Sequence, residues 1–127
     1  MKDSVVKEAM AMRKQAVAPY SNYTVGAAVL TKSGEIIGGC NVESSSYGLT
    51  CCAERIAIYN ALSAEHKKFN ALAVATANGG KPCGACRQVI WDICGDITIY
   101  IADGDGNLFE TTSTDLLPDA FGEDMLP

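Results

Sequence analysis

The sequence of 127 residues contains no long hydrophobic run, and it has fewer basic than acidic side chains. No apolar stretch approaches the roughly 18 residues of a membrane-spanning helix, and the charged N-terminal segment has no apolar signal-peptide region. Ten Lys and Arg against 15 Asp and Glu leave a formal charge of −5, which argues against nucleic-acid binding because phosphate contacts need clustered cations. We therefore expect a cytoplasmic protein that binds neither membranes nor nucleic acid.

Linkers, low-complexity segments and internal repeats are also missing. The chain is 48% hydrophobic and 20% charged, a composition typical of a globular protein rather than a disordered one. The length suits one domain. We therefore expect a single domain over residues 1–127.

The hydrophobic pattern predicts helices and strands in the order α-β-β-α-β-α-β-β-α. Helices are expected over residues 2–17, 51–62, 84–94 and 113–117, and strands over residues 25–30, 35–41, 71–76, 97–102 and 108–112. Thr50 and Ser113 are the expected N-caps of the second and fourth helices. The helical connections predict parallel neighbouring strands, whereas the short turn over residues 103–107 predicts an antiparallel final pair. The expected fold class is α/β, a three-layer α/β/α sandwich with a five-stranded mixed sheet.

Cysteine, in contrast, is plentiful. The six residues are Cys40, Cys51, Cys52, Cys83, Cys86 and Cys94. In a reducing compartment, clustered thiols bind metal or perform chemistry more often than they form disulfides. Cys83 and Cys86 form a C-x-x-C pair at one helix start, and Cys52 lies at another. If the two starts converge, three thiolates can bind zinc and leave the open fourth position of a catalytic site.

Glu54 follows the first of these cysteines by two residues and is the candidate catalytic residue. Zinc lowers the pKa of a bound water toward neutrality, and a positioned carboxylate that transfers the proton adds roughly 10²–10⁴-fold to the rate. Three thiolates and one Zn²⁺ sum to a charge of −1, so a donor beside the sulfurs is expected. Arg55 is the candidate for this role, and Gln88 is a second.

Two other interpretations of the cysteines remain open. Cys83 and Cys86 could form a redox disulfide, although this would leave Cys52 and Glu54 without a role. A structural zinc site would need a fourth protein ligand, for which Cys51 is the nearest candidate.

The remaining notable side chains are expected to be structural. Cys40 and Cys94 are predicted to be small packing residues. His66, the only histidine, lies in a polar stretch and is expected at the surface. Trp91 is expected in the core or at an interface.

The motif Cys52-Ala53-Glu54, followed by Pro82-Cys83-Gly84-Ala85-Cys86, resembles that of the zinc-dependent nucleoside deaminases. Residues 20–28, 39–43 and 116–118 extend the likeness, so that nearly the whole chain is similar to the small homotetrameric cytidine deaminases. The resemblance implies hydrolytic deamination of cytidine and 2′-deoxycytidine to uridine and 2′-deoxyuridine, with ammonia release, in pyrimidine salvage. It also implies one Zn²⁺ per subunit and a homotetramer with shared active sites.

The same resemblance assigns roles to individual residues. The implied zinc ligands are Cys52, Cys83 and Cys86, and the implied proton shuttle is Glu54. The implied substrate-binding residues are Tyr23, Asn41, Glu43, Tyr47, Ala53 and Phe121. Of these, Asn41 and Glu43 would hold the ribose 3′-hydroxyl and the Ala53 N–H would bind the base carbonyl, while Tyr47 and Phe121 would reach a neighbouring subunit's pocket.

Three departures from the family pattern leave the breadth of substrates open. Tyr23, which would pack against the base, stands where Phe is usual, Lys81 stands where Ser is common, and Ser44-Ser45 follow Glu43. Two other functions stay in view: a deaminase that acts on RNA or DNA, against which the charge of −5 stands, and a zinc-binding or redox module without catalysis.

Overall fold

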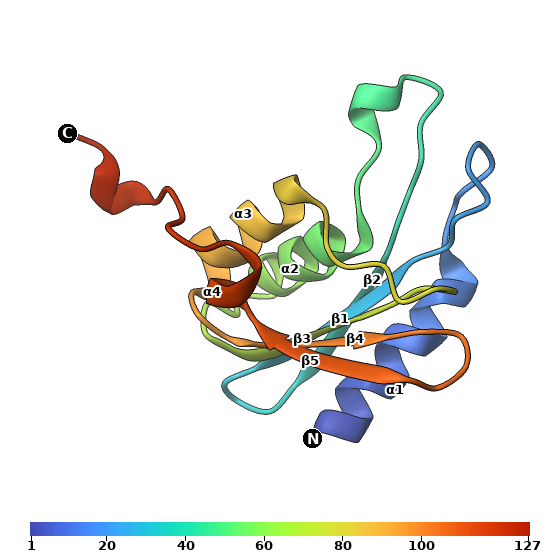
Figure 1. The fold of residues 1–127 in the computed structure, drawn as a ribbon, viewed down its shortest axis with the longest axis horizontal. Coiled ribbons are helices and arrows are strands. Elements are labelled where there is room, and N and C mark those ends of the chain that lie inside the picture. Colours follow the sequence, from blue (N-terminus) through green and yellow to red (C-terminus); the bar gives the residue numbers. More distant parts are fainter.

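The computed structural model describes residues 1–127 as one five-stranded sheet covered by helices on both faces (Figure 1). The strands are β1 (Gly26–Thr31), β2 (Ile36–Cys40), β3 (Phe69–Ala75), β4 (Thr98–Ala102) and β5 (Leu108–Thr112). The helices are α1 (Lys2–Met12), α2 (Ala53–Ser63), α3 (Gly84–Cys94) and α4 (Ser113–Leu116), with short 3₁₀ turns η1 (Arg13–Gln15), η2 (Tyr47–Leu49) and η3 (Glu123–Met125). The predicted three-layer α/β/α class is confirmed. No helix has both the length and the apolar character that a membrane span requires.

The sheet order is β2-β1-β3-β4-β5. The predicted parallel pair across α3 is confirmed for β3 and β4, and the final pair β4 and β5 is antiparallel as predicted. The prediction of parallel neighbours across α2 was wrong, because β1 lies between β2 and β3 and pairs antiparallel with both. The connection through α2 therefore skips one strand position.

Alternate residues of the three central strands, β1, β3 and β4, contribute to two separate cores. On one face Val29, Leu72 and Ile99 pack with Ile58 of α2 and Ile90 of α3. On the opposite face small strand residues, such as Ala28, Ala71 and Ala73, pack against Val5 and Ala9 of α1. Small side chains let α1 lie close to the sheet, whereas the bulkier face supports the two helices whose N-termini carry the cysteines.

The start of α2 is held against β2 by a glycine. A Cβ at Gly39 would lie 2.9 Å from the Cα of Ala57 and 3.0 Å from the carbonyl oxygen of Ala53. These distances are too short for a real side chain, so α2 can occupy this position only because residue 39 has none.

Two predicted helix caps were wrong. Helix α2 begins at Ala53 with Cys52 as its N-cap, and Thr50 instead accepts a hydrogen bond from the Ser44 N–H at 3.1 Å. Helix α4 is capped by Thr112, which accepts from the Asp115 N–H at 3.1 Å. The Ser113 hydroxyl is occupied with Ile97, whose N–H it accepts at 3.1 Å. The first helix also ends earlier than predicted, at Met12.

Candidate functional site

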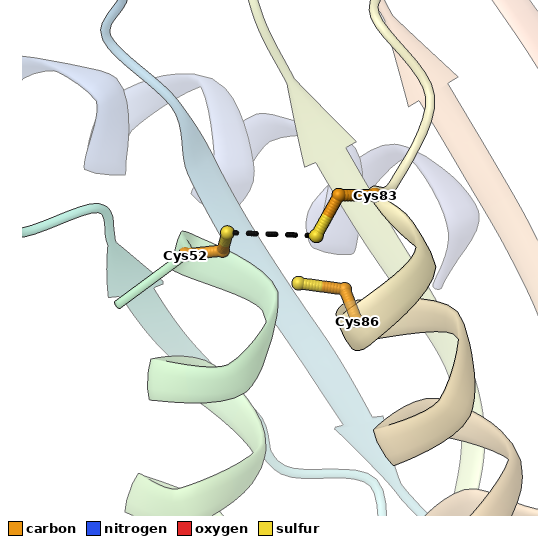
Figure 2. Close-up of side chains that lie close together, drawn as sticks. All are labelled: Cys52, Cys83 and Cys86. Carbon is orange, nitrogen blue, oxygen red and sulfur yellow. Dashed lines mark hydrogen bonds between the residues drawn. The ribbon is translucent and has the colours of Figure 1, made fainter. Parts of the chain in front are cut away.

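Three cysteine sulfurs meet where the N-termini of α2 and α3 converge (Figure 2). Cys52 is the N-cap of α2, Cys83 is the N-cap of α3, and Cys86 lies in the first turn of α3. Their Sγ atoms all lie within 4.8 Å of one another, and those of Cys52 and Cys83 are 3.8 Å apart. Tetrahedral Zn²⁺ with Zn–S bonds of about 2.3 Å needs sulfurs roughly 3.8 Å apart. The donor set and its spacing therefore fit a zinc ion.

The other cysteines lie outside this cluster. Cys51, the candidate fourth ligand of a structural site, does not belong to it, and burial raises the pKa of its thiol. Burial also raises the pKa of Cys94 to about 12, and the Cys40 thiol donates to the Gln15 carbonyl at 3.4 Å. No disulfide is present, the C-x-x-C pair included. The cluster thus offers three protein ligands and an open position.

Arg55 supplies the cation beside the sulfurs. Its Nη2 donates to the Sγ of Cys52 at 3.4 Å, and its Nε is buried without a hydrogen-bond partner. A hydrogen bond from the Cys86 thiol, aided by Arg55 and Cys83, lowers the pKa of Cys52 to about 5. The hydrogen bond to Cys52 in turn raises the pKa of the Arg55 guanidinium. The first helix turn and Arg55 together favour thiolate at this position.

Glu54 lies in the first turn of α2 and is 4% exposed. Burial raises the pKa of its carboxyl to about 7, and the charge of Cys52 acts in the same direction. A carboxyl with a pKa near neutrality can both accept and donate a proton at physiological pH. Position and environment therefore suit Glu54 to proton transfer beside the sulfurs.

A cavity of about 230 Å³ opens over the cluster. Cys52, Cys83 and Glu54 line one end, and Tyr23, Asn41 and Glu43 are among the residues that line the rest. Ala53 sits between Cys52 and Glu54 as the first residue of α2, where backbone N–H groups have no partner within the helix. Of the predicted substrate-binding residues, these four are at or beside the cavity.

Asn41 and Glu43 are both hydrogen-bonded to the loop before β1. The Asn41 amide nitrogen donates to the Tyr23 carbonyl at 2.8 Å, and its Oδ1 accepts from the Val25 N–H at 2.9 Å. Glu43 Oε1 accepts from the N–H groups of Tyr20 at 3.0 Å and Ser21 at 3.2 Å. The two side chains therefore fix the loop that carries Tyr23.

Ser21 is a site residue that sequence reasoning missed. Its hydroxyl donates to Glu43 Oε2 and accepts from the Tyr23 N–H at 3.0 Å. The hydrogen bond from the Ser21 hydroxyl to the Glu43 carboxylate is the main reason that the pKa of Glu43 is lowered. Its place in residues 20–28, two positions before Tyr23, could have pointed to Ser21. Serine is a common turn residue in loops, however, so its presence there did not single it out.

Three predicted residues are not brought to this cavity. Tyr47 and Phe121 are 76% and 57% exposed, and Tyr47 stacks edge-on with Tyr20 at a ring separation of 5.9 Å. The Gln88 amide donates to Asp92 at 3.1 Å and to the Phe121 carbonyl at 2.7 Å, rather than to a sulfur. Gln88 therefore anchors the C-terminal segment to α3.

His66 plays no part in the site. Its Nε2 lies 2.7 Å from a carboxylate oxygen of Glu35 in a surface pair, and it is not among the residues that line the cavity. Trp91 lies on α3 beside Phe121 and the C-terminal segment. His66 is partly buried beside Glu35 rather than fully exposed. Trp91 is also partly buried and belongs to neither core, so its expected place in the core or at an interface stays a prediction.

Comparisons with known proteins agree with this geometry. Residues 1–102 match the family described as "Cytidine and deoxycytidylate deaminase zinc-binding region". A cytidine deaminase from Sporosarcina psychrophila is 44% identical over 127 residues, which cover 98% of this chain and 93% of that protein. One from Halalkalibacterium halodurans is 46% identical over 125 residues, with 95% of each chain covered. The crystal structure of cytidine deaminase from Burkholderia pseudomallei superposes with a TM-score of 0.92 at 42% identity, and covers 95% of this chain and 99% of that one.

Proposed function

The chain belongs to the zinc-binding cytidine and deoxycytidylate deaminase family, and we propose that it hydrolyses cytidine and 2′-deoxycytidine to uridine and 2′-deoxyuridine with release of ammonia. The observation that carries this is one juxtaposition. Two of the three clustered sulfurs, those of Cys52 and Cys83, line one cavity with the buried carboxyl of Glu54 and the polar side chains of Asn41 and Glu43. The reaction would serve pyrimidine salvage.

Cys52, Cys83 and Cys86 would hold the single Zn²⁺ of each subunit. When bound there, zinc supplies a Lewis acid that lowers the pKa of water. Arg55 offsets the charge of the three thiolates through its contact with Cys52.

Glu54 moves the protons. It accepts one proton from the water whose oxygen adds to C4 of the pyrimidine, and delivers that proton to N3. It then takes the second proton from the new C4 hydroxyl and passes it to the amino group, so that C4 becomes a carbonyl as the C4–N bond breaks and ammonia departs. Its burial excludes bulk water from this transfer and brings its pKa close to working pH. Because the carboxyl ends each turnover in its starting state, water and cytidine are the only reactants consumed.

The other end of the cavity would hold the nucleoside. The Ala53 N–H is available to the base carbonyl, and the Tyr23 ring supplies an apolar wall. The Glu43 carboxylate and the second amide proton of Asn41 are suited to the ribose 3′-hydroxyl. Glu43 remains charged well into the acid range because Ser21 lowers its pKa.

We further propose a homotetramer in which subunits share active sites. Tyr47 and Phe121 are large, apolar and exposed, and η2 with its flanking loop projects from the body of the molecule (Figure 1). Light scattering is expected to give about four times the chain mass of 13.4 kDa. In that assembly Phe121→Ala should raise KM while leaving zinc content unchanged, and a monomer with unaltered kinetics would contradict the shared site.

Residues 1–127 would form one domain, since all five strands belong to one sheet. The cytoplasm would be its compartment, because its six cysteines are all free thiols and three of them are needed as zinc ligands.

The decisive experiment measures ammonia release and zinc content of the purified protein. The panel contains cytidine, 2′-deoxycytidine, cytosine, N4-substituted cytidines, blasticidin S and a cytosine-containing oligonucleotide. Turnover of the two free nucleosides is expected. Turnover of the oligonucleotide alone, or of blasticidin S alone, would overturn the salvage role, and bound zinc without any ammonia would indicate a module without catalysis.

A further inference from the structure

The hydroxyl of Tyr23 connects two loops that line the same cavity. It donates a hydrogen bond to Asn78 Oδ1 at 2.8 Å. Asn78 lies in the segment that leads from β3 to Cys83 at the start of α3. Tyr23, Gly80 and Cys83 all line the cavity, so this bond ties the wall of the nucleoside end to the segment that delivers a sulfur.

The acceptor that Tyr23 uses is itself held in place. Asn78 Oδ1 also accepts from the Thr76 hydroxyl at 3.3 Å and from the Gly80 N–H at 3.2 Å. The Gly80 N–H donates in addition to the Thr76 hydroxyl oxygen at 2.9 Å. Because Thr76 is buried directly after the last residue of β3, the turn over residues 76–80 has a fixed base. The phenol is therefore bonded to a rigid turn.

Gly80 leaves the space that the phenol oxygen occupies. A Cβ at this position would overlap the Tyr23 hydroxyl oxygen, whereas the next atoms, Asn78 Oδ1 and Tyr23 Cζ, would lie 3.5 and 3.6 Å away in ordinary contact. The backbone at residue 80 does not have a positive φ. The hydroxyl of Tyr23 is thus the one atom that forbids a side chain at residue 80.

We propose that Asn78 and Gly80 are positioning residues for Tyr23. Asn78 anchors the phenol, the absent side chain at residue 80 admits its hydroxyl, and together they set the width of the cavity at the wall. The substrate side of this assignment rests on the proposed function, in which Tyr23 packs against the base. The contact among the three residues does not depend on it.

A double-mutant cycle tests whether residue 80 lacks a side chain in order to admit the Tyr23 hydroxyl. The four proteins are wild type, Gly80→Ala, Tyr23→Phe and the double variant. Gly80→Ala should overpack the phenol, lowering the melting temperature by about 5 °C and raising KM for cytidine about tenfold by displacing the wall. In the double variant the oxygen is gone and the methyl group has room. Its melting temperature and KM should therefore return to those of Tyr23→Phe.

Two further variants separate positioning from general damage. Tyr59→Phe removes an exposed phenol that makes no hydrogen bond with this loop, and it should leave both measurements unchanged. Asn78→Ala removes the acceptor of Tyr23 together with the bonds from Thr76 and Gly80, so its effect should be at least that of Tyr23→Phe. Asn78→Asp keeps the acceptor oxygen and should retain the wild-type KM. In every variant kcat should change less than KM.

The proposal is overturned if Gly80→Ala matches wild type in melting temperature and KM, or if the double variant is no better than Gly80→Ala. Melting temperatures test the contact without turnover. If the wild-type protein released no ammonia from cytidine, the proposed function would fail, while rescue of the melting temperature in the double variant would still establish the matched pair.

Discussion

The two ends of the cavity are built in different ways. The sulfur end is formed by the first residues of two helices, α2 and α3; it includes the buried side chain of Glu54 and lies over the buried sulfur of Cys86. The nucleoside end is formed by loops whose side chains bond to one another, and Tyr23 there is 38% exposed. The comparison indicates that the proposed zinc ligands and proton carrier all come from helix starts of one chain, whereas the proposed substrate contacts depend on how loops are held.

The same difference sets the expected size of each perturbation. A change at the sulfur end removes a ligand or a proton carrier that nothing else in the cavity replaces. A change at the nucleoside end removes one hydrogen bond from a set, so the loop retains part of its order. Effects on kcat should therefore be concentrated at the sulfurs and effects on KM at the loops.

Cys83→Ala should have the largest effect. Two remaining thiolates hold zinc poorly, and metal binding is coupled to folding, so zinc content, turnover and melting temperature should all fall. Zinc is measured by atomic absorption and stability by thermal melting. Cys51→Ala is the matched control, since Cys51 adjoins the cluster without belonging to it, and loss of zinc in that control would favour a four-cysteine structural site instead.

Glu54→Gln should keep zinc and the fold but lower kcat by about 10²–10⁴-fold. The amide has the size of the carboxyl and cannot carry the proton. Because burial rather than a salt bridge dominates the environment of Glu54, the neutral replacement should not reduce the melting temperature. A variant with bound zinc and wild-type kcat would remove Glu54 from the mechanism.

Much of the sulfur end was predictable because its signals are local. Helix α3 and strand β5 have the predicted bounds, and the spacing of Cys52, Cys83 and Cys86 predicted the cluster that the structure shows. The start of α3 and the C-x-x-C spacing depend on neighbours within a few residues, which a sequence displays directly. The start of α2 was placed two residues early, at residue 51 instead of Ala53.

The nucleoside end was harder to predict because its contacts join distant loops. Ser21 meets Glu43 across 22 positions, and Tyr23 meets Asn78 across 55. The insertion of β1 between β2 and β3 was missed for the same reason, since strand order depends on packing rather than on any one segment. Gly80 carried no signal because its importance comes from an atom of Tyr23.

Arg55→Gln should have an intermediate effect, reducing turnover or zinc affinity about 10- to 100-fold. The substitution leaves the thiolate charge without its cation, so chelator competition should show weaker zinc binding. Arg55→Lys keeps the charge but not the forked geometry, so its zinc affinity and turnover should lie between those of wild type and Arg55→Gln. If Arg55→Gln bound zinc and turned over cytidine as wild type does, Arg55 would not be needed to offset the negative charge of the three thiolates.

Ser21→Ala should have the smallest effect, a rise of about tenfold in KM for cytidine, the size expected for loss of one charge-assisted hydrogen bond. For 3′-deoxycytidine, which offers no hydroxyl to Glu43, the same substitution should leave KM almost unchanged.

The pH profile of Ser21→Ala gives a second readout. Ser21 is the main cause of the lowered pKa of Glu43, so its removal raises that pKa, and the charged carboxylate is lost at a higher pH as the solution is acidified. The acid limb of the kcat/KM profile should therefore move to higher pH in Ser21→Ala. It should keep its wild-type position in Ser21→Thr, which retains the hydroxyl. Equal KM increases for both nucleosides, with an unmoved acid limb, would mean that Ser21 only supports the loop.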